Sequence, residues 1–390
     1  MEVLFANDTS GTSNPGCQGT VFWLLESLRR SGYHVGSRLP LEYAYESFRP
    51  SPLPPAPMDI ASRTSRRLQR ALREIGQTGQ ETSQGALAAS QWQQTVDSLA
   101  QQLAPLWDGF EALVVNGEGT IHHASIGALT LTGLCAVAKQ RGLRVAVVNC
   151  SVFELDEWLL EALCENVDDL AVREPLSQRY LSSKKINVRL SADCLFLAGE
   201  HPAEISFLSH RLAAGGEPYA VYTPGVLSGS PLVSEEVVAA DIRQLSRKGW
   251  KVFYYVVEKE DERLAKVAIE HGAQAIPLGG LVWNEVTAFL RNAEMVVSGR
   301  YHINIFAALS GTPFIPMESN TPKMAGLLHH LGVAEDYPVR GWNADTPDLM
   351  PLDFDAAVKV RREALEHCVE LARGAVSGLT GSHFVVKTDA

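Results

Sequence analysis

Arg300 and His302 lie two positions apart, where an apolar segment gives way to a run of small residues. The sequence from Met295 to Glu318 reads MVVSGRYHINIFAALSGTPFIPME. Free N–H groups and the helix dipole favour an anion at the start of a helix. Arginine adds a two-point grip on phosphate or carboxylate, and histidine can donate a proton near neutral pH. The pair predicts an anion site with a proton donor beside it. A salt-bridged arginine and a structural histidine are the alternative.

A second polar segment, NGEGTIHH, follows the apolar run ALVV. A glycine such as Gly117 lets a ligand approach the backbone closely. Glu118 is placed to act as a base or to accept a hydrogen bond from a hydroxyl. His122 and His123 are candidates for ligand contact. A tight turn between strand and helix, with solvated histidines, would explain the same residues.

Two further cations follow apolar segments. Arg173 ends DLAVRE, where it could hold an acid or pair with Glu174. Lys323 lies in the first turn of a helix for which Thr321 is the predicted N-cap. A cation there opposes the helix dipole unless an anion is bound. Lys323 therefore indicates a ligand, with Asn320 and Thr321 beside it.

The elements that must position these residues alternate between strand and helix along almost the whole chain, which is typical of parallel α/β architecture. We predict a first domain in residues 1–198, with a helical insertion at about 59–104 and a last strand in NVRLSADCLFL. A second domain is predicted in 199–350, and residues 351–390 form a helix that packs back on the first. Both domains are Rossmann-like, so their strand ends should meet at a common cleft. The loops SADC, with Asp193, and TPGVLSGS also follow strands and are weaker candidates.

The composition restricts the class of ligand. A formal net charge of −11 over 390 residues argues against binding to nucleic acid or to an acidic membrane. No apolar run approaches the roughly 18 residues that span a bilayer, and the opening MEVLFAN lacks the basic start of a signal peptide. The six cysteines have neither CxxC spacing nor a histidine at metal-ligand distance. We therefore predict free thiols in a cytoplasmic protein, with no bound metal.

Several of these segments, taken together and in order, resemble the polysaccharide pyruvyl transferase family. They are NGEGTI, DDLAVREPLSQRYL, VRLSADCLFL and AEMVVSGRYHINIFAALSGTPFIPMESNTPKMAGLLHHLG. The last is the most specific, with Arg-x-His, a small-residue helix, Gly-x-Pro and Pro-Lys. The resemblance covers most of residues 110–335. It implies a GT-B-like α/β fold, with two Rossmann-like doubly wound parallel-sheet domains and a cleft between them.

The resemblance also implies a reaction: pyruvate moves from phosphoenolpyruvate onto two hydroxyls of a sugar in a bacterial cell-surface polysaccharide or its precursor, forming a ketal. Phosphoenolpyruvate is then a co-substrate, and no cofactor is implied. His302 matches the family's general acid, and Arg300 and Arg173 match its arginines. With the neighbouring strand-end residues, the expected donor-binding set is Arg173, Arg300, Lys323, Asn320 and Thr321.

The acceptor side departs from the family pattern. The start of the chain has NPGCQG in place of an acidic residue after Asn-x-Gly, and NGEG replaces three consecutive glycines. The sequence therefore does not identify the acceptor sugar. Glu118 is expected to meet the acceptor hydroxyl, and the expected acceptor-binding residues are Asn14, Asn116, Gly117, Glu118 and His122.

Two other functions fit the same architecture. A GT-B glycosyltransferase would use the cations to bind a nucleotide-activated sugar, with Glu318 or Asn320 at the ribose. A noncatalytic relative in a biosynthetic complex would bind no donor. For the leading hypothesis the partners are an anionic small-molecule donor and a sugar or glycan acceptor, lipid-linked or free. That reading places the protein in the cytoplasm or peripherally at the inner face of the membrane, and apolar helix faces leave a homodimer open.

Overall fold

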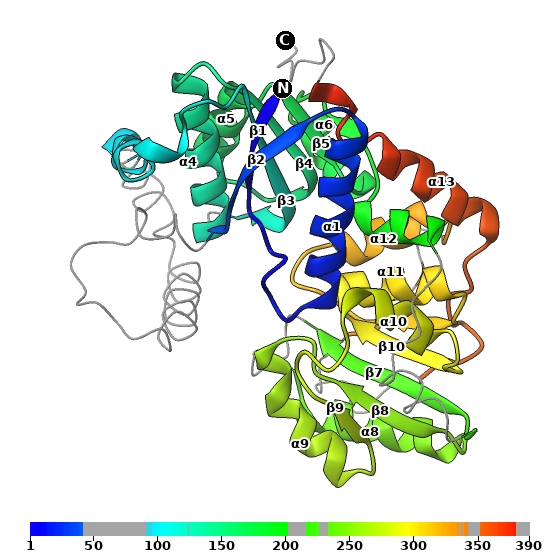
Figure 1. The fold of residues 1–390 in the computed structure, drawn as a ribbon. Coiled ribbons are helices and arrows are strands. Elements are labelled where there is room, and N and C mark those ends of the chain that lie inside the picture. The colour runs from blue at the N-terminus through cyan, green and yellow to red at the C-terminus, as the bar shows by residue number, and fades with distance from the viewer. Residues whose placement is uncertain are drawn as a thin grey trace, which may run out of the picture.

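The computed structural model consists of two α/β units, each built on a parallel sheet (Figure 1). It describes residues 1–41, 92–94, 96–123, 125–201, 216–225, 233–334, 337, 339–341 and 352–379. Most of the predicted insertion at about 59–104 lies outside the described residues. Of that segment, 92–94 and 96–102 are helical, and a short 3-10 helix, η4 (Ala104–Leu106), follows.

The first unit has a six-stranded parallel sheet in the order β2-β1-β3-β4-β5-β6. Its strands are β1 (Glu2–Ala6), β2 (His34–Leu39), β3 (Ala112–His122), β4 (Arg144–Phe153), β5 (Asp169–Val172) and β6 (Arg189–Leu190). The helices around it are α1 (Pro15–Arg30), α4 (Ile126–Gln140), α5 (Glu157–Asn166) and α6 (Pro175–Ser183).

The central strands of this sheet are buried on both faces, which explains their nearly continuous apolar sequence. Successive residues of β1 belong to different cores. Val3 and Phe5 lie in the core that contains α1, whereas Leu4 and Ala6 lie in the core that contains α4 and α5. Only the strand ends are left to carry polar side chains toward a ligand.

The second unit has a five-stranded parallel sheet in the order β11-β10-β7-β8-β9. Its strands are β7 (Tyr219–Gly225), β8 (Lys251–Tyr255), β9 (Gln274–Ile276), β10 (Met295–Gly299) and β11 (Phe314–Pro316). Its helices are α8 (Glu235–Arg247), α9 (Glu262–Glu270), α10 (Trp283–Leu290), α11 (Tyr301–Ser310) and α12 (Lys323–His330). The 3-10 helix η6 (Lys259–Asp261) follows β8.

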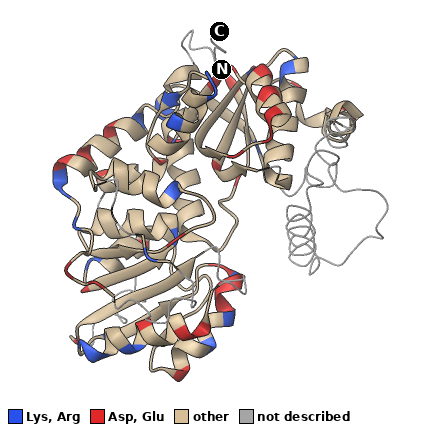
Figure 2. Ribbon diagram, turned by 180° about the vertical axis from the view of Figure 1, so that it is seen from behind, with Lys and Arg blue, Asp and Glu red and all other residues tan. Residues whose placement is uncertain are grey.

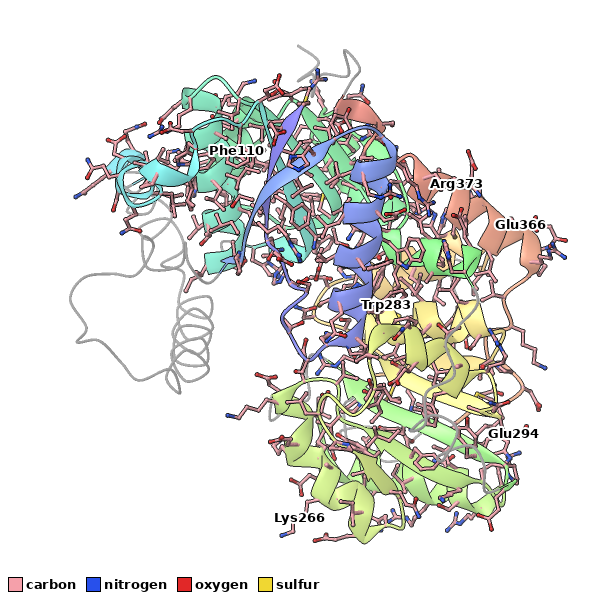
Figure 3. The ribbon with its side chains drawn as sticks, viewed as in Figure 1. Phe110, Lys266, Trp283, Glu294, Glu366 and Arg373 are labelled. Atoms are coloured by element: carbon pink, nitrogen blue, oxygen red, sulfur yellow. The ribbon has the colours of Figure 1, made fainter. Side chains whose placement is uncertain are left out.

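Helix α1 joins the two units. Figure 1 shows it between the first sheet and helices α10 and α11 of the second. Its Phe22 ring lies 4.8 Å from the ring of Trp283, which Figure 3 labels where α1 meets α10. The hydrophobic core on this side is continuous, because Trp23 and Phe196 belong to the same cluster as Phe289 and Phe306. The two units are therefore packed against each other through apolar contacts.

The chain between the first sheet and the second unit differs from the expected strand. The predicted strand NVRLSADCLFL is only two residues long as β6, and a 3-10 helix, η5 (Cys194–Glu200), replaces its second half. The cause is local: the Asp193 side chain accepts a hydrogen bond from the Leu195 amide over 2.9 Å and caps η5. Helix α13 (Arg362–Arg373) lies against η5, where Arg373 donates to Glu200 over 2.8 Å.

Charged residues of both signs are interspersed over the outer helices of both units (Figure 2). Across the described residues, no helix has the length and apolarity needed to cross a bilayer. The same part of the chain contains no group of three or more His, Cys, Asp or Glu side chains that could hold a metal ion.

Candidate active site between the two sheets

Arg173 lies directly after β5 at the boundary between the units. Its side chain is 1% exposed. Nε donates to Ser151 Oγ over 3.0 Å, and Nη1 donates to Asp193 Oδ2 over 2.8 Å. The guanidinium carbon lies 4.3 Å from the centre of the Tyr301 ring, a cation–π contact from the second unit. These contacts fix the guanidinium and leave Nη2 directed elsewhere.

Lys323 begins α12 in the second unit, and its side chain is buried. Among the described residues, its ammonium makes a hydrogen bond to Asn320 Oδ1 over 2.9 Å and no ion pair. Burial and the nearby charge of Arg173 lower the pKa of Lys323 to about 7. A buried lysine without a carboxylate partner is costly, and binding of an anion beside it would lower that cost.

Gly119 on β3 lies between these two cations. A Cβ on Gly119 would be 3.3 Å from Arg173 Nη2 and 3.3 Å from Lys323 Nζ. The two nitrogens therefore face one point, which the absence of a side chain keeps open. His122 lies at the edge, with Nε2 3.5 Å from Asn320 Nδ2, and burial lowers its pKa to about 4, so it is neutral there.

His302 reaches the same region from the first turn of α11. Its Nε2 lies 3.4 Å from Asp193 Oδ2, 3.4 Å from Thr20 Oγ1 and 3.5 Å from Arg173 Nη1. On the other side it packs against Gly16 of α1. A Cβ at Gly16 would lie 2.4 Å from His302 Nδ1, so the close approach requires glycine.

Arg300 does not face this opening. It occupies the N-cap position of α11, and the residue is 3% exposed. Nη1 donates to Glu258 Oε2 over 2.5 Å, and Nη2 donates to Asp261 Oδ1 over 2.6 Å. The structure thus has the salt-bridged arrangement that the sequence left as an alternative. The assignment of Arg300 to the donor's anions is corrected: its terminal nitrogens are held by carboxylates of its own unit.

Glu118 lies on β3 with its carboxylate held by neutral donors. Oε1 accepts hydrogen bonds from Thr9 Oγ1 and Asn116 Nδ2, each over 2.7 Å, and Oε2 is 3.2 Å from Cys17 Sγ. Its φ of 41° is rare for a residue other than glycine and is typical of functional sites. Burial and the charge of Glu118 raise the pKa of Cys17 well above its usual value, so the thiol stays protonated and donates.

Asparagines fix the ends of three neighbouring strands behind Glu118. Asn7 Nδ2 donates to the Asn116 carbonyl over 2.6 Å, and Asn149 Nδ2 donates to Asn116 Oδ1 over 3.2 Å. Asn149 Oδ1 then accepts from the Cys194 amide over 2.9 Å. The chain of amides ties Glu118 to the backbone next to Asp193. Asn116 is therefore a support for Glu118, in addition to any contact with an acceptor.

The remaining predicted residues are placed as follows. Gly117 is needed for packing, because a Cβ there would lie 2.2 Å from Cys150 Cβ on β4. The predicted N-cap at Thr321 is wrong: Pro322, with ψ of 4°, occupies that position, so α12 begins at Lys323. Thr321 Oγ1 is buried and has no hydrogen-bond partner among the described residues. The TPGVLSGS loop lies outside the described residues beyond Gly225.

Asn14 has both ends of its side chain occupied. Its Oδ1 accepts from the Gly16 amide over 2.9 Å and caps α1, and its Nδ2 donates to Glu258 Oε1 over 2.9 Å. Sequence reasoning did not identify Glu258 or Asp261, since both follow β8 far from Arg300 in the chain. It gave Asp193 only as a weak strand-end candidate, although the carboxylate in SADC was the sequence feature that could have identified a partner for Arg173 and His302.

Comparison with known proteins agrees with this architecture. Residues 42–321 match the polysaccharide pyruvyl transferase family. No curated protein sequence matches the chain. Among solved structures, the S. aureus MnaA–UDP co-structure has a TM-score of 0.54 at 11% identity and covers 97% of this chain and 93% of that chain. An Os79 variant from O. sativa in complex with UDP has a TM-score of 0.52 at 13% identity, covering 97% and 91%.

A putative UDP-N-acetylglucosamine 2-epimerase from Listeria monocytogenes has a TM-score of 0.51 at 11% identity, covering 97% of this chain and 93% of that chain. At such identities the likeness shows the fold alone. It confirms the predicted GT-B-like class of two parallel α/β domains.

Proposed function

Because the chain belongs to the polysaccharide pyruvyl transferase family, we propose that it transfers pyruvate from phosphoenolpyruvate to a sugar of a bacterial cell-surface polysaccharide or its precursor. The product is a cyclic pyruvate ketal across two hydroxyls of that sugar. The acceptor is a free glycan or a lipid-linked precursor at the inner face of the membrane.

One observation carries the proposal: Arg173 Nη2 and Lys323 Nζ face the same point above Gly119. Phosphoenolpyruvate carries a phosphate and a carboxylate, so it needs more than one cation. Arg173 offers the N–H groups of Nη2, held in a fixed direction, and Lys323 offers a compact charge. Because both are buried, their attraction to the donor is screened less than it would be at the surface.

His302 supplies the proton that starts the reaction. One N–H bond of its imidazolium breaks, and a C–H bond forms at the donor's methylene carbon, which becomes a methyl group. Positive charge develops at the adjacent carbon. In this scheme the carboxylate of Asp193, 3.4 Å from His302 Nε2, and the donor's own anionic groups stabilise that charge, so positioning and electrostatics supply most of the catalysis.

Glu118 accepts the proton of the first acceptor hydroxyl as its oxygen bonds to the charged carbon. The bond from that carbon to the phosphate oxygen then breaks. The second hydroxyl closes the ring, and its proton leaves with the phosphate. Glu118 and His302 return to their starting states by exchange with solvent. Arg300 is assigned a structural role in this scheme, holding the start of α11 through Glu258 and Asp261.

The test combines ligand binding with product analysis. Phosphoenolpyruvate should raise the melting temperature of the full chain by mass action, and mass spectrometry should find a pyruvylated sugar. His302→Gln should lower turnover by about 10²–10⁴-fold while donor stabilisation remains. His34→Gln, at an exposed histidine on β2, is the matched control.

Full turnover in His302→Gln would remove the assigned acid. The UDP in two of the similar solved structures does not identify a substrate of this chain. It does name the alternative donor to test, a nucleotide sugar. Stabilisation by a nucleotide sugar without any response to phosphoenolpyruvate would replace the proposal with a glycosyltransferase. Absence of any donor binding would indicate a noncatalytic relative.

A further inference from the structure

Asp193 is a fully buried carboxylate with every oxygen in contact with a donor. Its exposed fraction is 0%. Oδ1 accepts from Thr20 Oγ1 over 3.1 Å and from the Leu195 amide over 2.9 Å. Oδ2 accepts from Arg173 Nη1 over 2.8 Å and lies 3.4 Å from His302 Nε2. Although burial alone would raise it, the nearby charges of His302 and Arg173 hold the pKa of Asp193 below its usual value.

The partners of Asp193 come from different parts of the fold. Arg173 follows β5 and Thr20 belongs to α1, both in the first unit, whereas His302 lies on α11 of the second. Thr20 Oγ1 touches both Asp193 and His302 Nε2. With Gly16 against its other side, the imidazole is enclosed between α1 and the carboxylate.

Arg173 alone does not explain why the Asp193 carboxylate is buried at this position. Arg173 uses only Nη1 on Asp193, since Nε is bound to Ser151 and Nη2 faces Gly119. The oxygen that takes Nη1 is the same oxygen that lies beside the imidazole. The carboxylate is thus placed to balance a second positive charge, and the imidazolium is the group in position to carry it.

We propose that Asp193 is the positioning residue for the acid: its carboxylate, 3.4 Å from Nε2, holds and stabilises the imidazolium of His302 across the domain boundary. The effect of Asp193 on turnover rests on the proposed function, whereas its contact with His302 does not. Asp193 stays ionised throughout, while the imidazolium loses its N–H proton to the methylene carbon of the donor.

Several titratable groups face this pair. Cys194 on η5 and Tyr301 on α11 lie near Asp193, and Arg173, which contacts both members of the pair, also lies near Cys17 on α1, Glu118 and Lys323. Burial raises the pKa of both thiols and of the tyrosine well above their usual values. These three groups therefore stay neutral over the range in which histidine titrates. The variant is expected to act through the charge at position 193.

The experiment follows the imidazole directly, independently of any substrate. The titration midpoint of His302 is measured by NMR in the full chain, with its signal assigned by its loss in His302→Gln. Asp193→Asn should lower that midpoint, because the imidazolium loses its carboxylate. Asp169→Asn is the control: it removes another buried carboxylate, paired with Arg189, and should leave the midpoint unchanged.

The kinetic readout then separates positioning from mere support. In Asp193→Asn the alkaline limb of the kcat–pH profile should move to lower pH. At pH values below that limb, part of the lost kcat should return. An equal loss at every pH, or an unchanged midpoint, would overturn the inference. If Asp193→Asn does not fold, Thr20→Val tests the same contact, with a smaller shift in the same direction expected. If the His302 midpoint shifts in Asp193→Asn but the wild-type protein shows no pyruvyl transfer, the proposed reaction is wrong and the inferred Asp193–His302 contact still holds.

Discussion

Asn14 donates its side-chain amide to Glu258 over 2.9 Å, so the residue that caps α1 in one domain is hydrogen-bonded to the residue that holds Arg300 in the other. The start of α1 packs on His302, and Arg300 begins the helix that carries His302. One asparagine therefore links the position of the first domain to the position of the acid.

Substitutions at Asn14 should separate its two roles. Asn14→Ser keeps an oxygen that can cap α1, whereas Asn14→Ala removes the cap and should cost about 1 kcal/mol more in the free energy of unfolding. Both lose the bond to Glu258. A hydrogen bond to a charged group contributes about 1.5–3 kcal/mol to stability. We expect kcat/KM to fall in both variants, because the start of α1 no longer fixes the position of His302. Urea unfolding and steady-state kinetics measure the two effects. Equal stability of the two variants would show that the cap is unimportant.

Donor affinity should depend on pH through Lys323. Burial and the charge of Arg173 lower its pKa to about 7, and only the protonated amine attracts an anion. Affinity should therefore be highest below pH 7 and fall as the pH rises through 7, with proton uptake on binding. Calorimetry in buffers of different ionisation enthalpy detects that proton. Lys323→Arg stays charged throughout, so any slope that remains in this variant belongs to the donor's own phosphate. A slope that is the same in both proteins contradicts the assignment.

Gly119→Ala should block the donor without disturbing the fold. Its methyl group would occupy the point that Arg173 and Lys323 both face, with each nitrogen only 3.3 Å away. We expect the KM for donor to rise by at least about tenfold, since crowding of this kind costs about 1–3 kcal/mol. Gly11→Ala is the matched control, because nothing lies within 4 Å of a Cβ there. A wild-type KM in Gly119→Ala would move the donor away from this site.

Arg300→Met should destabilise the protein more than it alters donor binding. It leaves Asp261 buried at 0% exposure without its cation, and breaking a buried pair costs about 3–5 kcal/mol. Urea unfolding measures the loss. The double variant Arg300→Met with Asp261→Asn should recover part of it, because the buried carboxylate charge is removed with the cation. A stable single variant that no longer binds donor would restore Arg300 as a direct ligand.

The sequence predicted the fold and the meeting of Arg173, His302 and Lys323 because all three follow strands, and parallel strands bring their carboxyl ends to one edge. It did not determine what Arg300 pairs with. A strand-end arginine has the same local sequence whether it faces a ligand or a carboxylate. The answer depends on Glu258 and Asp261, which reach Arg300 only through the order of the sheet. Burial of Asp193 likewise comes from packing of the domains.

Asn116, in the chain of amides behind Glu118, is also a site at which deamidation can occur. Asn116 is followed by Gly117, the pairing in which an asparagine in a loose chain cyclises and deamidates most readily. Strand β3 holds this peptide extended, and Asn116 is fully buried with its side chain bonded to Glu118 and Asn149. Local opening of the sheet would let an aspartate form beside Glu118, replacing an N–H donor with a second negative charge. Ageing of the stored enzyme should therefore begin there, as a slow gain of mass in the peptide that contains Asn116 and a parallel loss of activity.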